Sequence, residues 1–313
     1  MCGVSKATVS RVLNQRTQGF SVKPEVRQRI LNTARQLGYS PNLAASSLKK
    51  KKSRIITILG FTAPLRDEPS IYPPLVNAAV KELQRHEYQA VATFPHYQTG
   101  HYTLPAWKTE AYLILQATGE VPVEKIVQTR VPYVILNGTA ASPSGTGILV
   151  DEKEGMALLM DYLYRLGHRR IAYRDTRLSP HHYSVLQRRR FYEERCRDLG
   201  MVPVLPEPAL KPVEFLQSSR EQAITAVIAY SHREALALLE AAHQLQIDIP
   251  AQMSIACFND LYPLHIIRPA ITSVRLPLED MGRTGARALM ENIDRIAAGK
   301  TALDDRMLKP SLI

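Results

Sequence analysis

Apolar segments of strand length alternate with helical patterns from residue 55 onward. Segment 55–59 reads Ile-Ile-Thr-Ile-Leu, a buried-type strand, and residues 74–86 place apolar side chains on one helical face. This alternation predicts an α/β fold of parallel sheets flanked by helices. Two such sheets joined by crossing strands would hold a ligand at the carboxyl ends of their strands. Further strands are expected at 88–94, 111–115, 131–136, 147–150, 167–173, 226–229, 253–258 and 272–275, and further helices at 152–166, 233–245 and 278–298.

The net charge of the chain lies entirely in residues 1–54. This segment holds 12 of the 40 basic residues and one of the 29 acidic residues, Glu25, so it carries the whole formal charge of +11. From residue 55 onward, 28 basic residues accompany 28 acidic ones. A neutral body behind a basic N-terminal segment predicts a polyanion as the partner of that segment.

Several classes of protein are disfavoured by composition and motifs. No apolar run approaches the ~18 residues that span a bilayer, and no signal peptide is expected. Cys2, Cys196 and Cys257 lack the C-x-x-C spacing of a zinc site, and their odd number fits a reducing cytosol better than a disulfide framework. The sequence contains no G-x-S-x-G, P-loop, H-E-x-x-H or G-x-G-x-x-G motif. We therefore expect neither enzymatic activity nor a cofactor or metal.

The basic segment has the pattern of two short helices. Ser5 can cap the first helix, Pro24 suits the first position of the second, and Gly38 suits its end. Two such helices packed at an angle form a helix-turn-helix, whose polar helix enters the major groove of DNA. The alternative is a solvated helical pair whose charges only maintain solubility. The apolar face of the first helix consists of Val9, Val12 and Leu13.

The order of residues in this segment resembles the DNA-binding head of the LacI/GalR family of bacterial transcriptional regulators. The resemblance rests on Val4 through Asn14, on Val22, and on Leu37-Gly38-Tyr39-Ser40-Pro41-Asn42. It implies that Lys6, Ala7 and Arg11 occupy base-reading positions. The residues that it places against phosphates or neighbouring bases are Ser5, Thr8, Ser10 and Asn14.

The head departs from the family pattern at its beginning. The family has an earlier helix before the turn at Gly3-Val4-Ser5, where this sequence has only Met1 and Cys2. The first helix of the helix-turn-helix is therefore expected to be missing. Either the true start lies upstream, which the intact remainder of the head favours, or the chain is a damaged repressor.

Within the expected hinge, residues 42–48 are too short and too poor in bulky side chains to form a stable helix alone. They can be a flexible linker followed by a solvated lysine run. The family resemblance instead implies a hinge that becomes helical on the operator and enters the minor groove. Leu48 aligns with the residue that wedges between base pairs, at an unstacking cost of a few kcal/mol.

The resemblance continues through the body, where it implies a periplasmic-binding-protein-like fold of type I. We therefore expect a small all-α head at 1–41, a hinge at 42–53 and an effector-binding and dimerisation body at 54–313. Within the body, the expected N-lobe comprises about 54–149 plus 277–313, and the expected C-lobe about 150–276. The strings that carry the resemblance include Val150-Asp151, Leu166 through Ile171, Ile249-Pro250, Pro269 through Val274 and Met281-Gly282.

Four body residues are candidates for effector binding. Arg188 aligns with the family's ligand arginine, whose planar fork suits two hydroxyls or a carboxylate, and the alternative is a surface charge. Asn259 and Ser231 stand where the family commonly has acidic or amide residues, and Tyr72 can form an aromatic wall. Loss of the usual pocket acids would tolerate a sugar acid or sugar phosphate, and it suits a neutral glycoside equally. Trp107, the only tryptophan, is as consistent with an ordinary core or surface role as with sugar stacking.

These features together predict a cytoplasmic, nucleoid-associated bacterial transcriptional regulator, a repressor that binds a double-stranded operator under the control of a small carbohydrate effector. The C-terminal part lacks a leucine heptad, so a homodimer is expected and a tetramer is not. The alternatives are a DNA-binding-defective truncated regulator and a stand-alone sugar-binding module. A transporter-linked binding protein is disfavoured by the basic head.

Overall fold

The computed structural model describes residues 3–13, 21–39, 52–60, 70–94, 96, 99, 102–115, 121–175, 182–206 and 210–313. The chain separates into two compact units, Met1–Arg54 and Ile55–Ile313. Among the described residues, no helix is long and apolar enough to cross a membrane.

The first unit contains helices α1 (Lys6–Leu13) and α2 (Pro24–Gln36). The backbone N–H of Thr8 donates to Ser5 Oγ at 3.1 Å, which confirms the expected cap of α1. Pro24 occupies the first turn of α2, and Gly38 follows the helix with φ of +60°, a conformation that glycine adopts without strain.

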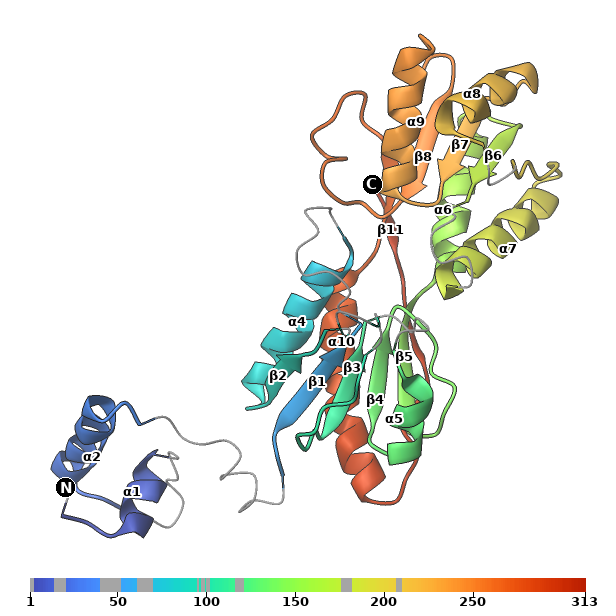
Figure 1. The fold of residues 1–313 in the computed structure, drawn as a ribbon. Helices are drawn as coiled ribbons and strands as arrows, with labels where there is room; N and C mark the ends of the chain where they lie inside the picture. The colour runs from blue at the N-terminus through green and yellow to red at the C-terminus, as the bar shows by residue number, and fades with distance from the viewer. Residues whose placement is uncertain are drawn as a thin grey trace. The chain divides into compact units, whose positions relative to one another are not determined.

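The second unit is an α/β body with two sheets, as the alternating pattern predicted (Figure 1). The N-lobe sheet has six strands in the order β10-β5-β4-β3-β1-β2, and all of its pairings are parallel. Helices α4 (Tyr72–Arg85) and α10 (Leu278–Ala297) cover one face, and α5 (Val123–Thr129) covers the other. The strands are β1 (Ile55–Leu59), β2 (Gln89–Ala92), β3 (Ala111–Ile114), β4 (Tyr133–Leu136), β5 (Gly145–Val150) and β10 (Arg306–Leu308).

The C-lobe sheet has five strands in the order β11-β9-β8-β7-β6, of which the first pair is antiparallel and the others are parallel. Helices α6 (Glu152–Arg165) and α7 (Tyr183–Asp198) pack on one face, and α8 (Pro212–Glu221) and α9 (His232–Gln244) pack on the other. The strands are β6 (Ile171–Arg174), β7 (Ala226–Ala229), β8 (Ser254–Phe258), β9 (Thr272–Arg275) and β11 (Ser311–Leu312).

The chain passes between the two sheets at residue 151, at 276–277 and at 309–310. The last passage differs from the expected lobe division, which assigned 277–313 to the N-lobe. Strand β11 instead pairs with β9 of the C-lobe sheet, because Ser311 and Leu312 lie opposite Arg275 and Val274. All three connections therefore act as short links on which one lobe can move relative to the other.

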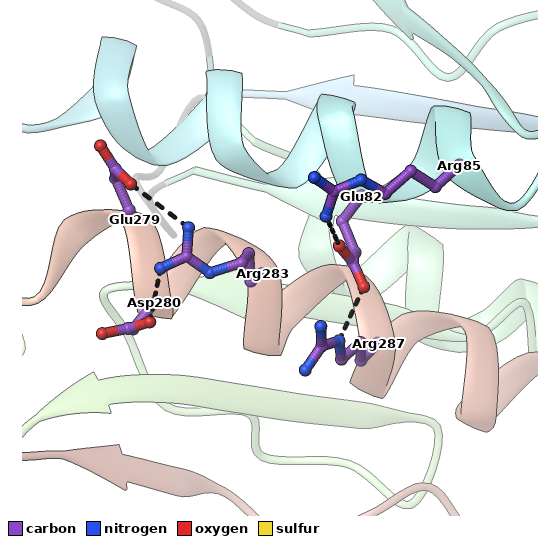
Figure 2. A network of polar contacts seen from close by, with 6 residues as sticks. All are labelled: Glu82, Arg85, Glu279, Asp280, Arg283 and Arg287. Atoms are coloured by element: carbon purple, nitrogen blue, oxygen red, sulfur yellow. Dashed lines mark hydrogen bonds and ion pairs between the residues drawn. The ribbon is translucent and has the colours of Figure 1, made fainter.

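Helices α4 and α10 hold the N-lobe together through a close approach and a polar network. A Cβ atom at Gly282 of α10 would overlap the backbone oxygen of Leu75 in α4, so glycine permits this contact. Figure 2 shows that buried Glu82 of α4 lies between two arginines, accepting from Arg287 at 2.7 Å and from Arg85 at 2.9 Å. Hydrogen bonding to Arg287, followed by that to Arg85, lowers the pKa of Glu82 against the raising effect of burial.

Candidate functional site

The outer face of α1 presents polar side chains to solvent. Lys6, Ala7, Ser10 and Arg11 are exposed, whereas Val12 of the same helix is buried. Ser5 and Thr8 form the start of the helix, with their hydroxyl oxygens 2.9 Å apart. The face therefore combines cationic and hydroxyl donors, the groups that contact phosphates and guanine edges. Asn14, Leu48 and residues 42–51 of the expected hinge lie outside the described residues.

An apolar groove of about 990 Å³ opens between the two helices of the head. Its lining combines α1, α2 and the segment after α2, where Leu37 is 76% exposed. The side chains of α2 thus cover the apolar face of α1 only in part. The apolar lining residues are Val4, Val9, Leu13, Ile30, Ala34, Leu37 and Tyr39.

In the body, Arg188 lies at the centre of a buried cluster. Its side chain is 2% exposed and forms a two-pronged ion pair with Glu152, the first residue of α6. Nε donates to Glu152 Oε2 at 2.7 Å, Nη2 donates to Oε1 at 3.1 Å, and Nη1 donates to the backbone oxygen of Tyr230 at 2.8 Å. The guanidinium carbon also lies 4.0 Å from the ring centre of Phe258. The α7 arginine is therefore fixed in a plane against the carboxyl ends of β7 and β8.

Burial and pairing act in opposite directions on the ionisation of this pair. Burial lowers the pKa of Arg188, but the neighbouring Glu152 carboxylate raises it more, so the net shift is upward and the guanidinium stays charged. For Glu152, burial raises the pKa and Arg188 opposes that effect. Both carboxyl oxygens accept from Arg188, which is the bonding pattern of a carboxylate. The pair is thus two opposite charges in a low-dielectric environment.

A chain of hydrogen bonds connects this cluster to the N-lobe. Tyr230 Oη lies 2.8 Å from Ser184 Oγ, which lies 2.8 Å from His182 Nδ1 at the start of α7. The His182 ring also hydrogen-bonds to the backbone of Asn137, which directly follows β4 of the N-lobe. The Asn137 side chain hydrogen-bonds to Tyr72 at the start of α4. Burial is the main cause that raises the pKa of Tyr72, so its phenol remains protonated.

The two remaining candidates follow strand ends of the C-lobe. Ser231 comes directly after Tyr230, and its hydroxyl donates to Glu234 in the first turn of α9. Asn259 comes directly after Phe258 in a left-handed conformation, with φ of 69°, and its buried Oδ1 has no hydrogen-bond partner in the described part of the chain. Asp260 pairs with Arg275 at 2.7 Å, which is a structural contact.

The structure thus links Arg188 to Tyr72 through a chain of hydrogen bonds, and it places Ser231 directly after Tyr230, which follows β7, and Asn259 directly after Phe258 of β8. It also adds residues that the sequence analysis did not identify. Trp107 lies elsewhere, where its Nε1 donates to Thr57 in β1. The sequence did hold a signal for three residues of the site. Asn137, Tyr230 and Asn259 each directly follow an expected strand, and the carboxyl ends of parallel strands lie at one edge of a sheet. The residues not identified from sequence are Asn137, Glu152, His182, Ser184 and Tyr230.

Two protein families match this chain. Residues 1–42 match "Bacterial regulatory proteins, lacI family", and residues 160–311 match "Periplasmic binding protein-like domain". The chain belongs to the LacI family of bacterial regulators. This LacI-family chain is 28% identical over 316 residues to the HTH-type transcriptional regulator MalR of Streptomyces coelicolor. The alignment covers 93% of this chain and 87% of the relative. It is 31% identical over 198 residues to the arabinose metabolism transcriptional repressor of Geobacillus stearothermophilus, covering 58% of the chain and 52% of the relative.

Solved structures show the same fold for this LacI-family chain. The lac repressor dimer bound to operator and the anti-inducer ONPF matches with a TM-score of 0.79 at 20% identity, over 100% of this chain and 94% of that one. A transcriptional regulator CelR–cellobiose complex matches with a TM-score of 0.67 at 23% identity, over 100% of this chain and 95% of that one. The expected architecture of a helix-turn-helix head and a two-lobed type I body is confirmed.

Proposed function

We propose that this LacI-family regulator is a repressor that binds operator DNA through α1 and responds to a small carbohydrate bound between its lobes. The exposed donor face of α1 carries the DNA part of the proposal. Lys6 and Arg11 lie on that face in a segment of net charge +11, and duplex DNA is the polyanion that such a helix fits. Ala7 between them offers a methyl contact to thymine.

A homodimer would place two copies of α1 in successive major grooves of a near-palindromic operator. The solved relative that is described as a lac repressor dimer bound to operator supports this arrangement. Leu48 would wedge into the minor groove at the centre of the site, and Asn14 would contact the backbone beside α1. The complex would form on the bacterial nucleoid in the cytoplasm.

The interlobe hydrogen bonds carry the effector part of the proposal. Asn137 joins Tyr72 on the N-lobe side to His182 on the C-lobe side, so a ligand at this point contacts both lobes. Such a ligand favours one relative arrangement of the lobes and shifts the dimer between states of different operator affinity. Solved relatives in complex with cellobiose and with D-xylulofuranose support a sugar as the ligand.

The DNA part can be tested by selecting an operator from a random duplex pool with the intact chain. Binding of the selected duplex is then compared with that of a scrambled duplex for Lys6→Ala, Arg11→Ala and the control Arg29→Ala, which removes an exposed charge from α2 instead. The α1 variants should lose about tenfold or more in discrimination, whereas Arg29→Ala should weaken both duplexes equally or not at all. Failure to enrich any duplex, or unchanged discrimination in both α1 variants, would contradict the proposal and favour a DNA-binding-defective regulator.

A further inference from the structure

The bonding of Arg188 leaves a defined set of donors for a ligand. A guanidinium has five N–H groups, and three of them are used, two by Glu152 and one by the backbone oxygen of Tyr230. The two N–H groups without these partners belong to the two terminal nitrogens, one on each. They form a fork that matches two adjacent ligand oxygens, either the hydroxyls of a polyol or the oxygens of a carboxylate.

The charges around the fork distinguish these two kinds of ligand. Glu152 already compensates Arg188 at contact distance, so the pair as a whole is neutral. An anionic ligand at the fork would therefore approach the Glu152 carboxylate, and like charges at close range weaken binding.

An unsatisfied acceptor beside the cluster indicates that the ligand carries hydroxyl groups. Asn259 Oδ1 is buried without a hydrogen-bond partner in the described residues, immediately after Phe258, whose ring lies against Arg188. A buried oxygen of this kind is satisfied by a donor. A ligand hydroxyl can supply that donor, whereas an ionised carboxylate or phosphate placed at this oxygen cannot. Asn259 therefore favours a hydroxyl group of the ligand at this point, and the ion pair of Arg188 and Glu152 carries the argument on ligand charge.

We propose that Glu152 sets the ligand class of this site: by neutralising Arg188, it selects an uncharged polyhydroxylated effector, a neutral sugar or glycoside, over its sugar-acid or sugar-phosphate counterpart. The proposal rests on the proposed effector function and narrows it, since the sequence alone left the charge of the effector open. Glu152 is a positioning residue, because it holds the arginine in place and compensates its charge. A purely structural pair would not need to lie at the strand ends beside an unsatisfied amide oxygen, and buried ion pairs contribute little net stability.

The test uses the intact chain and matched sugars. Thermal midpoints and calorimetric affinities are measured with cellobiose, maltose, L-arabinose and D-galactose, and each is compared with its aldonate and, for galactose, with the uronate and the 6-phosphate. At least one neutral sugar should bind with an affinity about tenfold or more above that of its anionic counterparts. A wild-type protein that binds an anionic member as well as or better than its neutral partner would overturn the proposal and leave the effector function standing.

Variants in the helix pair α6 and α7 test whether Glu152 causes the preference for neutral sugars. Glu152→Gln removes the charge at nearly constant size and should shift the neutral-to-anionic affinity ratio by about tenfold toward the anion. Asp161→Asn is the matched control, since Asp161 of α6 pairs with Arg195 of α7 on the half-exposed side of the same two helices, and its ratio should not change. Glu152→Asp keeps the charge and should keep the wild-type ratio even if affinity falls.

Each of the other possible results either supports or overturns the proposal about Glu152, or bears only on the head. An unchanged ratio in Glu152→Gln would overturn the proposal. If that variant does not fold, the wild-type ratio together with a preserved ratio in Glu152→Asp supports it, and a lost ratio in Glu152→Asp overturns it. No binding of any sugar would overturn both this proposal and the effector part of the proposed function. Loss of operator binding alone bears on the head and leaves the proposal intact.

Discussion

Arg188 has a structural role in the buried cluster in addition to the binding role that we propose for it. Removing the arginine alone leaves the Glu152 charge buried without its partner. We expect Arg188→Met to lower the free energy of unfolding by about 3–5 kcal/mol, the usual cost of breaking a buried ion pair. The double variant Glu152→Gln/Arg188→Met should lose much less, because the remaining amide carries no charge. Urea denaturation of the wild type, both single variants and the double variant gives the coupling energy.

A matched double-variant cycle at Asp161 and Arg195 tests whether burial is the reason for the large coupling energy between Glu152 and Arg188. These side chains are 38% and 29% exposed, so their coupling should stay within about 1 kcal/mol. Equal coupling energies in the two cycles would contradict the assignment of Arg188 and Glu152 as a buried charge pair.

His182 makes the start of α7 sensitive to pH. Burial lowers its pKa below the ordinary 6.5, and the charge of Arg188 lowers it further. The neutral ring accepts from the backbone N–H of Ser184. Because the pKa is lower in the folded state, this stabilisation is present above pH of about 6.5 and is lost as the pH falls through the folded value. We expect the free energy of unfolding to decline between pH of about 7 and about 5.

His182→Asn separates the cap from the titration. Asparagine is a good N-cap that does not titrate, so the variant should keep its stability near neutral pH and show a shallower decline on acidification. His182→Ala should instead lose about 1 kcal/mol at neutral pH. His168, whose pKa burial also lowers, remains in all three proteins as an internal reference. Identical pH profiles for the wild type and His182→Asn would contradict the assignment.

At the scale of elements, the contact between α4 and α10 depends on one missing side chain. Glycine in a helix interior is normally less favourable than alanine by about 0.5–1 kcal/mol, so Gly282→Ala would stabilise an isolated α10. Here the added methyl group would overlap the backbone oxygen of Leu75, and neither backbone can yield easily. We expect a net loss of about 1–3 kcal/mol, the usual cost of overpacking.

The loss should appear as a lower urea midpoint of the body. Thr284→Ala, on the same helix but less buried, serves as the control and should change the midpoint little. A stabilised Gly282→Ala protein would show that the two helices can separate without cost and that the observed approach is not required.

Most elements of the body could be predicted from sequence because buried parallel strands appear as unbroken apolar runs. Strands β1, β7 and β9 have the expected bounds, and α6 and α10 differ from theirs by one residue at the C-terminal end. The short elements were not predicted. Strand β11 has two residues, and α5 has seven residues after a proline, so neither shows a full hydrophobic period.

The candidate site could be predicted only in part, because its residues are far apart in the sequence. Arg188 was found by resemblance, but its partner Glu152 lies 36 residues earlier on another helix. Nothing in the local pattern of Glu152 distinguishes it from the acids that often begin a helix, such as neighbouring Glu154. The charge of the site therefore remained open until the fold brought α6 and α7 together. Expected contacts of Asn14 and Leu48 stay predictions.

At the scale of the molecule, charge and core are divided between the two units. The three large apolar clusters of the described residues consist of side chains from the second unit. The head holds the net charge of +11. This division suits a regulator whose sensor folds around its ligand while the head supplies electrostatic attraction to DNA.

A chain that begins at Ile55 should therefore keep its thermal response to sugars and lose all measurable affinity for duplex DNA. In the intact protein, each neutralised phosphate releases counterions, and two heads with several phosphate contacts each should lose roughly a thousandfold in affinity between about 50 and about 200 mM salt. Fluorescence anisotropy with a labelled duplex across this range measures the slope for both proteins. If the shortened chain bound the duplex with the same slope as the intact one, the attraction would have to come from the neutral body, where 28 bases and 28 acids leave no net charge to supply it.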